Sequence, residues 1–363
     1  GDEFVAVLGD LDSAQDLEPL IQRLRMLAAD PVTLGQLALK VTASIGVTSY
    51  PADASDAEHL LRHADQAMYL AKQAGKNQHH TFDVVSDAAV RVRHEELSAI
   101  KRGCELGEFV LHYQPEVDMR TGRLMGVEAL VRWEHPTRGL LSPDQFLPLV
   151  EDQAFAVEMG GMILDMALAQ MEQWRSIGLT VPVSVNLFAR QLQDRDFAAR
   201  LAGLLERHPA ASPRNLLLEI VETKALEDVA QVSAAMRACA QLGVQFALDD
   251  FGTGYSSLTY LKALPAGLLK IDKGFVRDML DDEDDLGIVQ GVIGLARAFG
   301  REVIAEGVES IAHGRLLLSL GCNLGQGYGI ARPMPAADLP RWLVLWRARQ
   351  PWAELPQVLA SES

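Results

Sequence analysis

The sequence predicts an α/β protein, namely a (β/α)8 barrel of the TIM type with an antiparallel first strand, preceded by a partial α/β fragment. Two strand-like runs, 109–119 and 124–134, are joined by four residues. That connection is too short for a crossover, so the two strands pair antiparallel. Short apolar runs then alternate with helical stretches about every 25–35 residues, as in βα units. Eight strands in roughly 250 residues is the size of such a barrel.

The composition is that of a folded globular protein, with 48% hydrophobic and 23% charged residues among 363. It excludes a disordered chain, a collagen and a coiled coil, and the length predicts about two domains. The net charge of −16 argues against a nucleic-acid partner. A small phosphorylated ligand stays open, because bound metal ions can invert a local field.

The cysteine pattern and hydropathy bear on cellular location. The three cysteines are isolated, without a CxxC motif, which disfavours zinc and disulfides and fits a reducing compartment. No apolar run reaches the roughly 18 residues that a membrane-spanning helix needs. We expect a cytoplasmic protein. Because the sequence opens without an initiator Met, an inner-membrane tether in an upstream segment stays open as an alternative.

The first segment, 1–82, predicts a β-α-β-α fragment. Its apolar residues recur at helical spacing in two stretches and follow a strand pattern in two others. Gly75 follows the second helical stretch at the place where helices commonly end. The predicted elements are a strand at 4–8, a helix at 17–27, a strand at 41–50 and a helix at 56–74.

The remainder of the chain consists of a connection, the barrel and a tail. Residues 83–96 are polar and charged, and are interpreted as a connecting helix or linker. The barrel is expected over 97–350, followed by a C-terminal tail at 351–363. After the antiparallel pair, the predicted strands are 182–188, 216–221, 245–250, 268–272, 302–306 and 324–330.

Nearly every predicted barrel strand ends in an acid, an amide or a lysine. In barrels of this type the carboxyl ends of the strands converge on the face where active sites lie. Carboxylates that converge repel one another unless cations lie between them, and hard oxygen ligands favour Mg²⁺ or Mn²⁺ over zinc. The residues are Glu128, Asn186, Glu219, Asp249, Asp250, Lys270, Asp272, Glu306, Glu309 and Gln326.

Each of these positions also has a purely structural explanation. One acid at a strand end is more often a helix cap or a turn residue than a catalytic group. Seven coincident strand ends carry the prediction instead. The acid run at 281–285 is interpreted as a solvated loop at a helix N-terminus, and Gly252 and Gly254 as parts of a tight βα loop.

The motifs at these strand ends resemble those of EAL-type cyclic-di-GMP phosphodiesterases. The resemblance covers about 97–345 and includes Glu128-Ala129-Leu130, Tyr113-Gln114-Pro115 and the highly specific nonapeptide that begins at Asp249. The first segment resembles the second half of a GGDEF-type diguanylate cyclase domain, through Asp2-Glu3-Phe4 and the stretch from Ala64 to Asn77. The earlier half of that domain is absent from the sequence.

The resemblance implies a two-metal enzyme that opens one phosphodiester bond of cyclic-di-GMP and releases linear pGpG. It implies Mg²⁺ or Mn²⁺ as cofactor and inhibition by Ca²⁺. The catalytic residues would be Lys270, which orients or helps deprotonate the attacking water, and Glu306. The implied metal ligands are Glu128, Asn186, Glu219 and Asp249 for the first ion and Asp249, Asp250 and Glu306 for the second. The implied substrate contacts are Gln114, Leu130, Arg132, Glu309 and Gln326, and Glu222 would steady the loop after Asp250.

Two other functions and one assembly are compatible with the same residues. A catalytically silent receptor for cyclic-di-GMP is disfavoured because no implied metal ligand is missing. A nucleotide cyclase is disfavoured because the first segment lacks the strand that would carry its metal-binding Asp. A homodimer through the Asp250–Ser257 loop and the next helix would explain the large side chains of Tyr255, Leu258, Tyr260 and Leu261. Internal packing explains them equally well.

Overall fold

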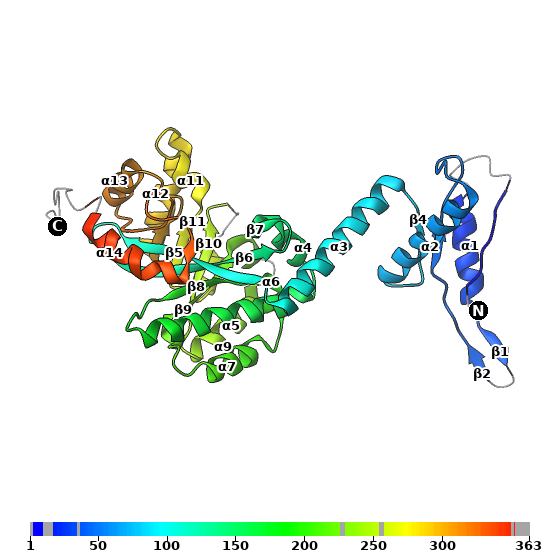
Figure 1. The fold of residues 1–363 in the computed structure, drawn as a ribbon, viewed down its shortest axis with the longest axis horizontal. Helices are drawn as coiled ribbons and strands as arrows, with labels where there is room; N and C mark the ends of the chain where they lie inside the picture. Colours follow the sequence, from blue (N-terminus) through cyan, green and yellow to red (C-terminus); the bar gives the residue numbers. More distant parts are fainter. Residues whose placement is uncertain are drawn as a thin grey trace. The chain divides into compact units, whose positions relative to one another are not determined.

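The computed structural model describes residues 3–9, 17–34, 37–225, 229–253, 258–349 and 352, in two compact units, Gly1–Ser98 and Ala99–Ser363 (Figure 1). Helix α3 (Val84–Leu106) begins in the first unit and ends in the second. The stretch interpreted as a connecting helix or linker is therefore helical from Val84 onward. No helix in the described ranges is long and apolar enough to cross a membrane.

The first unit contains both predicted helices and two small sheets. Helix α2 begins after Asp56, whose side chain accepts a hydrogen bond from the His59 N–H, and ends just before Gly75, which has φ 116°. Gly46 lies so close to α2 that an added Cβ would be 1.9 Å from the Ala64 carbonyl oxygen. The elements are α1 (Leu17–Ala29), the antiparallel pair β1 (Val32–Leu34) and β2 (Leu37–Leu39), and α2 (Ala57–Gln73) beside the parallel pair β3 (Ile45–Val47) and β4 (His79–Thr81).

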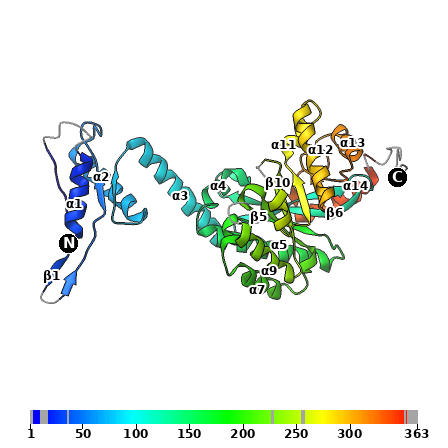
Figure 2. The same cartoon turned by 180° about the vertical axis from the view of Figure 1, so that it is seen from behind.

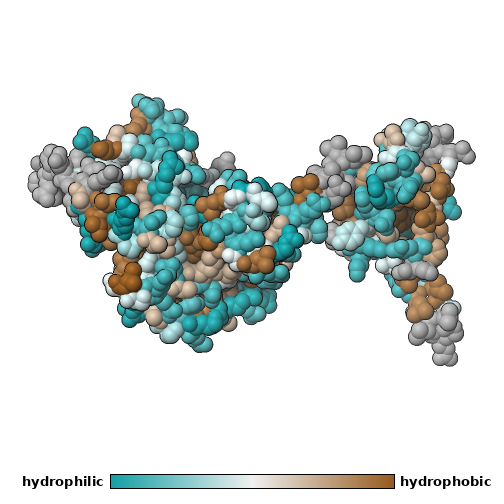
Figure 3. All heavy atoms as spheres, in the orientation of Figure 1, coloured by the Kyte–Doolittle hydropathy of each residue, from teal (hydrophilic) through white to brown (hydrophobic). Residues whose placement is uncertain are grey.

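The strand predicted at 4–8 is wrong. Phe4 and Val7 are each 92% exposed, and none of the strands described in the first unit pairs with this segment. An apolar run becomes a strand only when another strand supplies the hydrogen bonds along its edge. Figure 3 shows that apolar side chains also gather around the β1–β2 pair, where Val32 and Leu39 are exposed.

The second unit is a closed eight-stranded barrel, as predicted. The hydrogen-bonded order around it is β5, β6, β8, β9, β10, β11, β12, β13 and again β5. Strand β5 is antiparallel to both neighbours, and the other seven run parallel to one another. The bounds are β5 (Phe109–Asp118), β6 (Arg123–His135), β8 (Val183–Asn186), β9 (Leu216–Val221), β10 (Gln245–Phe251), β11 (Leu268–Ile271), β12 (Glu302–Ala305) and β13 (Leu324–Gly325).

Helices cover the outside of the barrel. Helices α5, α7 and α9 lie side by side on one flank, which both views of the chain show (Figures 1 and 2). Asp282 caps α12 by accepting the backbone N–H groups of Asp284 and Asp285, so the acid run is the helix start that was predicted. The longer helices are α5 (Phe155–Ser176), α7 (Phe197–Arg207), α9 (Val229–Gln241), α12 (Glu283–Ala298), α13 (Ile311–Leu320) and α14 (Leu339–Arg349).

Short helices and strands complete the unit. The strand predicted at 324–330 ends at Gly325, because Gly327 and Gly329 pack against the backbone of Val308 and Glu309 and draw the chain out of the sheet. The short elements are β7 (Gly139–Leu141), β14 (Met334–Pro335), α4 (Leu147–Val150), α6 (Ala189–Gln193), α8 (Glu222–Ala225), α10 (Leu258–Ala263) and α11 (Lys273–Asp278).

An apolar layer inside the barrel forms the floor beneath the predicted site. The layer consists of buried Ala247, Leu268 and Ile304 with the partly buried Leu217 and Leu324. Each of these residues comes two positions before a predicted site residue, which lies on the same strand or, for Glu306 and Gln326, just beyond its end. Because alternate residues of a strand share a face, the predicted site residues lie one layer above this floor, at the carboxyl ends of the parallel strands.

Candidate active site

The acids predicted at the strand ends converge on one buried ammonium group. Lys270 is fully buried, and its Nζ lies 2.7 Å from Glu306 Oε1 and 2.9 Å from Glu219 Oε2. The same nitrogen is 3.3 Å from Glu128 Oε2 and 4.0 Å from Asp249 Oδ1. Four different strands or strand ends thus direct carboxylates toward one cation.

The predicted amides fix the orientation of Glu128. Asn186 Nδ2 donates to Glu128 Oε1 at 2.6 Å, and Gln326 Nε2 donates to Glu128 Oε2 at 2.6 Å. Gln326 also donates to Gln114 Oε1 at 3.2 Å, while Gln114 Nε2 donates to the Ala331 carbonyl at 3.0 Å. Each carboxylate oxygen of Glu128 is therefore held in place by an amide donor. The network joins residues of β5, β6 and β8 to the chain that follows β13.

The shared burial of these acids perturbs their pKa values. Burial is the main cause that raises the pKa of Glu306 to about 8 and that of Asp250 to about 7, with repulsion from Asp249 adding to both. Burial also raises the pKa of Glu219 and Asp249. For Glu128, burial alone would raise the pKa, but attraction to Lys270 and the amide hydrogen bonds outweigh it and lower the pKa.

Lys270 is held in its charged form. Burial alone would lower the pKa of its ammonium, but the charges of Glu128, Glu219 and Glu306 outweigh burial and raise it well above its usual range. A lysine with this pKa donates hydrogen bonds and does not accept protons near neutral pH. The geometry therefore suits orientation of a water or a phosphate oxygen.

The donor set fits hard divalent cations. Oxygens of Asp249, Asp250 and Glu306 lie within 4.8 Å of one another, and Glu219 Oε1 is buried with no hydrogen-bond partner among the residues that the structure describes. All are oxygen ligands, which Mg²⁺ and Mn²⁺ prefer. Asp250 has φ 52°, a left-handed conformation that is uncommon outside glycine and tends to persist at functional sites.

Glu222 braces the loop that follows Asp250. Its side chain is 1% exposed, and Oε2 accepts the Gly252 N–H at 2.8 Å. Thr253 Oγ1 donates to the Asp250 carbonyl at 2.8 Å. Glu222 thus contacts the loop that it is predicted to steady, and its role there stays a prediction. The four residues that follow, 254–257, lie outside the described residues.

The predicted substrate contacts border the cluster to different degrees. Arg132 is partly buried and donates to the Val131 carbonyl at 2.9 Å, while Leu130 is partly buried beside it. Glu309 is exposed and interacts electrostatically with Arg277, so it lies outside the buried network. Asp272 caps α11 by accepting the Gly274 N–H at 2.8 Å, which is the structural use expected of a lone strand-end acid.

One buried acid of the cluster was missed. Glu116 on β5 is 4% exposed, and burial raises the pKa of its carboxyl to about 7. The same alternation that places Gln114 inside the barrel also places Glu116 inside, and this was the available signal. From sequence alone, an acid in a hairpin strand is expected to face solvent, because the strands that cover it are not yet known.

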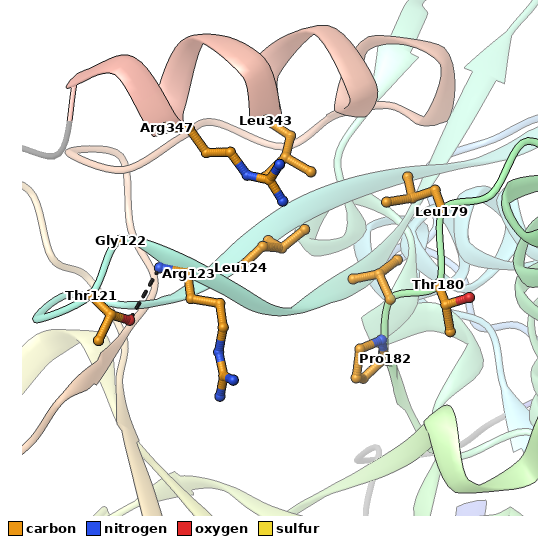
Figure 4. A pocket seen from close by; sticks show the side chains of 10 residues that line it. Thr121, Gly122, Arg123, Leu124, Leu179, Thr180, Pro182, Leu343 and Arg347 are labelled. Carbon is orange, nitrogen blue, oxygen red and sulfur yellow. Dashed lines mark hydrogen bonds between the residues drawn. The ribbon is translucent and has the colours of Figure 1, made fainter.

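Two cavities, of about 370 and 350 Å³, lie at the opposite end of the barrel, where the parallel strands begin. The larger one is bordered by the β5–β6 turn and α14 (Figure 4). Arg347 extends from α14 toward Leu124, whereas Arg123 points away from Arg347 (Figure 4). The two guanidinium groups do not converge, so the acid cluster is the better candidate for chemistry.

Comparisons with known proteins identify the family of each segment. The sequence model of the EAL domain matches residues 97–333, and that of the diguanylate cyclase GGDEF domain matches residues 1–78. The bifunctional diguanylate cyclase/cyclic di-GMP phosphodiesterase MucR of Pseudomonas aeruginosa is 39% identical over 340 residues, 93% of this chain and 49% of MucR. The cyclic di-GMP phosphodiesterase PdeR of Escherichia coli is 35% identical over 343 residues, 94% of this chain and 51% of PdeR. The chain spans about half the length of these curated relatives.

Solved structures match the barrel unit. The PaMucR phosphodiesterase in its c-di-GMP complex is 42% identical, with a TM-score of 0.65, and the match covers 68% of this chain and 99% of that one. The EAL domain of Mycobacterium smegmatis DcpA is 34% identical, with a TM-score of 0.56, over 66% of this chain and 98% of that one.

Proposed function

Because this chain belongs to the EAL domain family, we propose that it hydrolyses cyclic-di-GMP to linear pGpG with Mg²⁺ or Mn²⁺ as cofactor. The observation that carries the proposal is the buried network around Lys270, which brings four of the implied metal ligands to one ammonium and a fifth, Asn186, to Glu128. Two relatives named as cyclic di-GMP phosphodiesterases and a solved c-di-GMP complex support the substrate.

The proposed ligands divide into two overlapping groups. Glu128, Asn186, Glu219 and Asp249 would hold one ion, and Asp249, Asp250 and Glu306 the other. Bound there, divalent ions would lower the pKa of an attacking water and neutralise charge on the phosphodiester. The all-oxygen donor set supports this assignment, as do the close oxygens of Asp249, Asp250 and Glu306 and the buried Glu219 Oε1, which has no partner within the described ranges.

The chain's own residues would prepare the reaction in three ways. The Lys270 ammonium would donate to the attacking water or to a nonbridging oxygen, which fits its raised pKa better than removal of a proton does. Gln326 and Asn186 would keep Glu128 in a ligating orientation. Arg132 would contact a phosphate at the rim, and burial lowers its pKa without removing its charge.

The test is release of linear pGpG by the full chain. Glu128→Gln should reduce turnover by about a hundredfold or more, because an amide replaces a ligand and changes the network. Glu108→Gln is the matched control: Glu108 accepts from Trp133 Nε1 at 2.9 Å outside the cluster, and this variant should keep the parent turnover. Binding of cyclic-di-GMP without any pGpG release by the parent would favour the silent receptor instead.

Dimerisation stays a prediction. Residues 254–257, including Tyr255, lie outside the described residues, and the side chains of Leu258 and Tyr260 lie outside them as well. Leu261 is 2% exposed, so its side chain packs inside the barrel unit. Light scattering at micromolar concentration tests the remaining prediction, and a monomer alone would contradict a stable dimer.

A further inference from the structure

The first unit carries a pair of histidines on one face of α2. His59 and His63 are four residues apart, a spacing that places two side chains on the same side of a helix. Their ring centroids are 6.3 Å apart, and the ring planes meet at 63°. Two imidazoles that share one metal ion have centroids roughly 5–6 Å apart, because each metal–nitrogen bond is about 2.0–2.1 Å long. A small rotation of one ring would therefore bring the pair into range of a common ion.

Each of the two rings is oriented by its own aspartate. His59 Nδ1 lies 2.7 Å from Asp56 Oδ1, and His63 Nδ1 lies 2.7 Å from Asp53 Oδ2. Asp56 is also the N-cap of α2 and accepts the His59 backbone N–H at 2.9 Å. Asp53 also accepts the Thr48 hydroxyl at 2.8 Å. Contacts to the fold thus hold both acids, and the acids in turn hold the rings.

The aspartates determine which ring nitrogen is available. Hydrogen bonds from Ser55 and His63 lower the pKa of Asp53. Hydrogen bonds from the backbone and side chain of His59 lower the pKa of Asp56, so both acids are carboxylates at neutral pH. A carboxylate only accepts hydrogen bonds, so Nδ1 of each ring carries a proton and the neutral imidazole has its lone pair on Nε2. Neither Nε2 atom has a hydrogen-bond partner among the residues that the structure describes.

His63 is the fixed member of the pair, and His59 is the adaptable one. The His63 ring stacks on Phe82, with centroids 4.0 Å apart and planes at 13°, and its side chain is 15% exposed. The His59 side chain is 47% exposed, so its ring can rotate into water without disturbing the packing of the unit. One ligand is therefore held in place beside a second that can close on an ion.

We propose that His59 and His63 bind one divalent cation of the Zn²⁺ class through their Nε2 atoms. Imidazole nitrogens suit Zn²⁺, Ni²⁺ and Cu²⁺, whereas Mg²⁺ prefers oxygen ligands. A carboxylate on the other ring nitrogen is the usual partner of a metal-bound histidine, and here each ring has one. No group of three ligating side chains in the described ranges includes either histidine, so water molecules would complete the coordination of the ion.

The ion would stabilise a unit that has little core of its own. The buried hydrophobic side chains that the structure describes in the first unit are Ile21, Ala67 and Ala71. Small folds with so little buried apolar surface are commonly stabilised by a structural metal. His59 lies in the first turn of α2 and His63 in the second, so one ion would join the two turns. An ion that binds only the folded form shifts the equilibrium toward it.

The test is Zn²⁺ binding by the full chain in an excess of Mg²⁺, which competes for the acids of the barrel. Zn²⁺ should shift the Nε2 signals of both His59 and His63 in ¹⁵N NMR, and Mg²⁺ alone should leave them unchanged. His59→Gln should lower the affinity of the site, followed through the His63 signal, by about tenfold or more. Ring signals that do not move in an excess of Zn²⁺, or equal affinity in His59→Gln and the parent, overturn the proposal.

A second variant and a control separate the orienting role of the carboxylate from the presence of a histidine. Asp56→Asn keeps a good N-cap residue but removes the carboxylate, so it should weaken Zn²⁺ binding by about 10–100-fold while α2 persists. His135→Gln is the control, because His135 Nδ1 accepts the backbone N–H groups of Thr137 and Arg138 and the ring proton is therefore on Nε2. This control should bind Zn²⁺ as the parent does, and a loss as large as that in His59→Gln would contradict the assignment.

A final readout follows α2 itself. Zn²⁺ should slow hydrogen exchange of the backbone amides in the first two turns of α2 in the parent, but not in His59→Gln. Circular dichroism in EDTA should give the same helix content for both proteins, which shows that the variant is folded. Slower exchange in both proteins, or in neither, refutes a site at this pair. None of these measurements depends on turnover, so their outcome is separate from that of the proposed hydrolysis.

Discussion

Replacing Lys270 by methionine should make the barrel depend on divalent ions for its stability. Methionine fills most of the same volume but carries no charge. In the parent, the ammonium lies 2.7 Å from Glu306, 2.9 Å from Glu219 and 3.3 Å from Glu128. Removing one partner from a buried charge network typically costs about 3–5 kcal/mol. Because the acids can take up protons, we expect the lower value, about 3 kcal/mol, in EDTA at slightly alkaline pH.

This loss should be visible by tryptophan fluorescence. All five tryptophans lie in the barrel unit, so their emission reports its unfolding. A loss of about 3 kcal/mol corresponds to a fall of roughly 6–12 °C in the unfolding midpoint for a domain of this size. Adding Mg²⁺ should recover most of the fall, because cations replace the missing charge. The control is Lys101→Met, which removes an exposed lysine near Phe155. Equal midpoints for Lys270→Met and the parent in EDTA would refute the reasoning.

Three further predictions follow from the same site. Chelation with EDTA should abolish pGpG release, and Mg²⁺ or Mn²⁺ but not the larger and more flexibly coordinated Ca²⁺ should restore it; full activity in EDTA would contradict the two-metal assignment. The raised pKa values of Glu306, about 8, and Asp250, about 7, mean that these acids favour the fold while protonated. Their contribution to stability is complete below about pH 4 and is lost as the pH rises through 7 and 8. The unfolding midpoint of the metal-free chain, followed by fluorescence, should therefore decrease as the pH is raised from about 5 to about 8, and an increase would contradict this assignment. Glu222→Ala should lower kcat by about tenfold or more and cost about 1–3 kcal/mol of stability, because the Gly252 N–H loses its buried acceptor; Glu222→Gln should recover part of both, and equal kcat values in all three proteins would exclude the loop role.

The barrel could be predicted because local sequence patterns indicate each of its strands. A short apolar run that ends in a polar residue predicts both a strand and the position of its carboxyl end. The four-residue connection between β5 and β6 predicts that β5 runs antiparallel to β6. The strand predicted at 4–8 failed for the opposite reason. A strand needs a partner, and the pattern within five residues contains no information about one.

The candidate site shows the same limit. Convergence of Glu128, Glu219 and Asp249 follows from topology alone, once the strands are known to be parallel. Glu116 does not lie at a strand end, so only the alternation from Gln114 indicates that it faces inward, and the space beside it at Gly126 is visible only in the structure. The role of each residue in turnover depends on its chemistry, which kinetic measurements on variants test.

The reversed direction of β5 decides where the polypeptide enters the barrel. Were β5 parallel to its neighbours, the incoming chain would arrive beside the two cavities, at the end farthest from the carboxylates. Instead Phe109 pairs with Trp133, so the last turn of α3 reaches the rim at which Arg132 lies. A methyl group added at Gly103 would press against Trp133 Nε1 at 2.9 Å, one residue from Arg132. A small displacement of the end of α3 would therefore act directly on the rim of the barrel, without passing through the apolar floor.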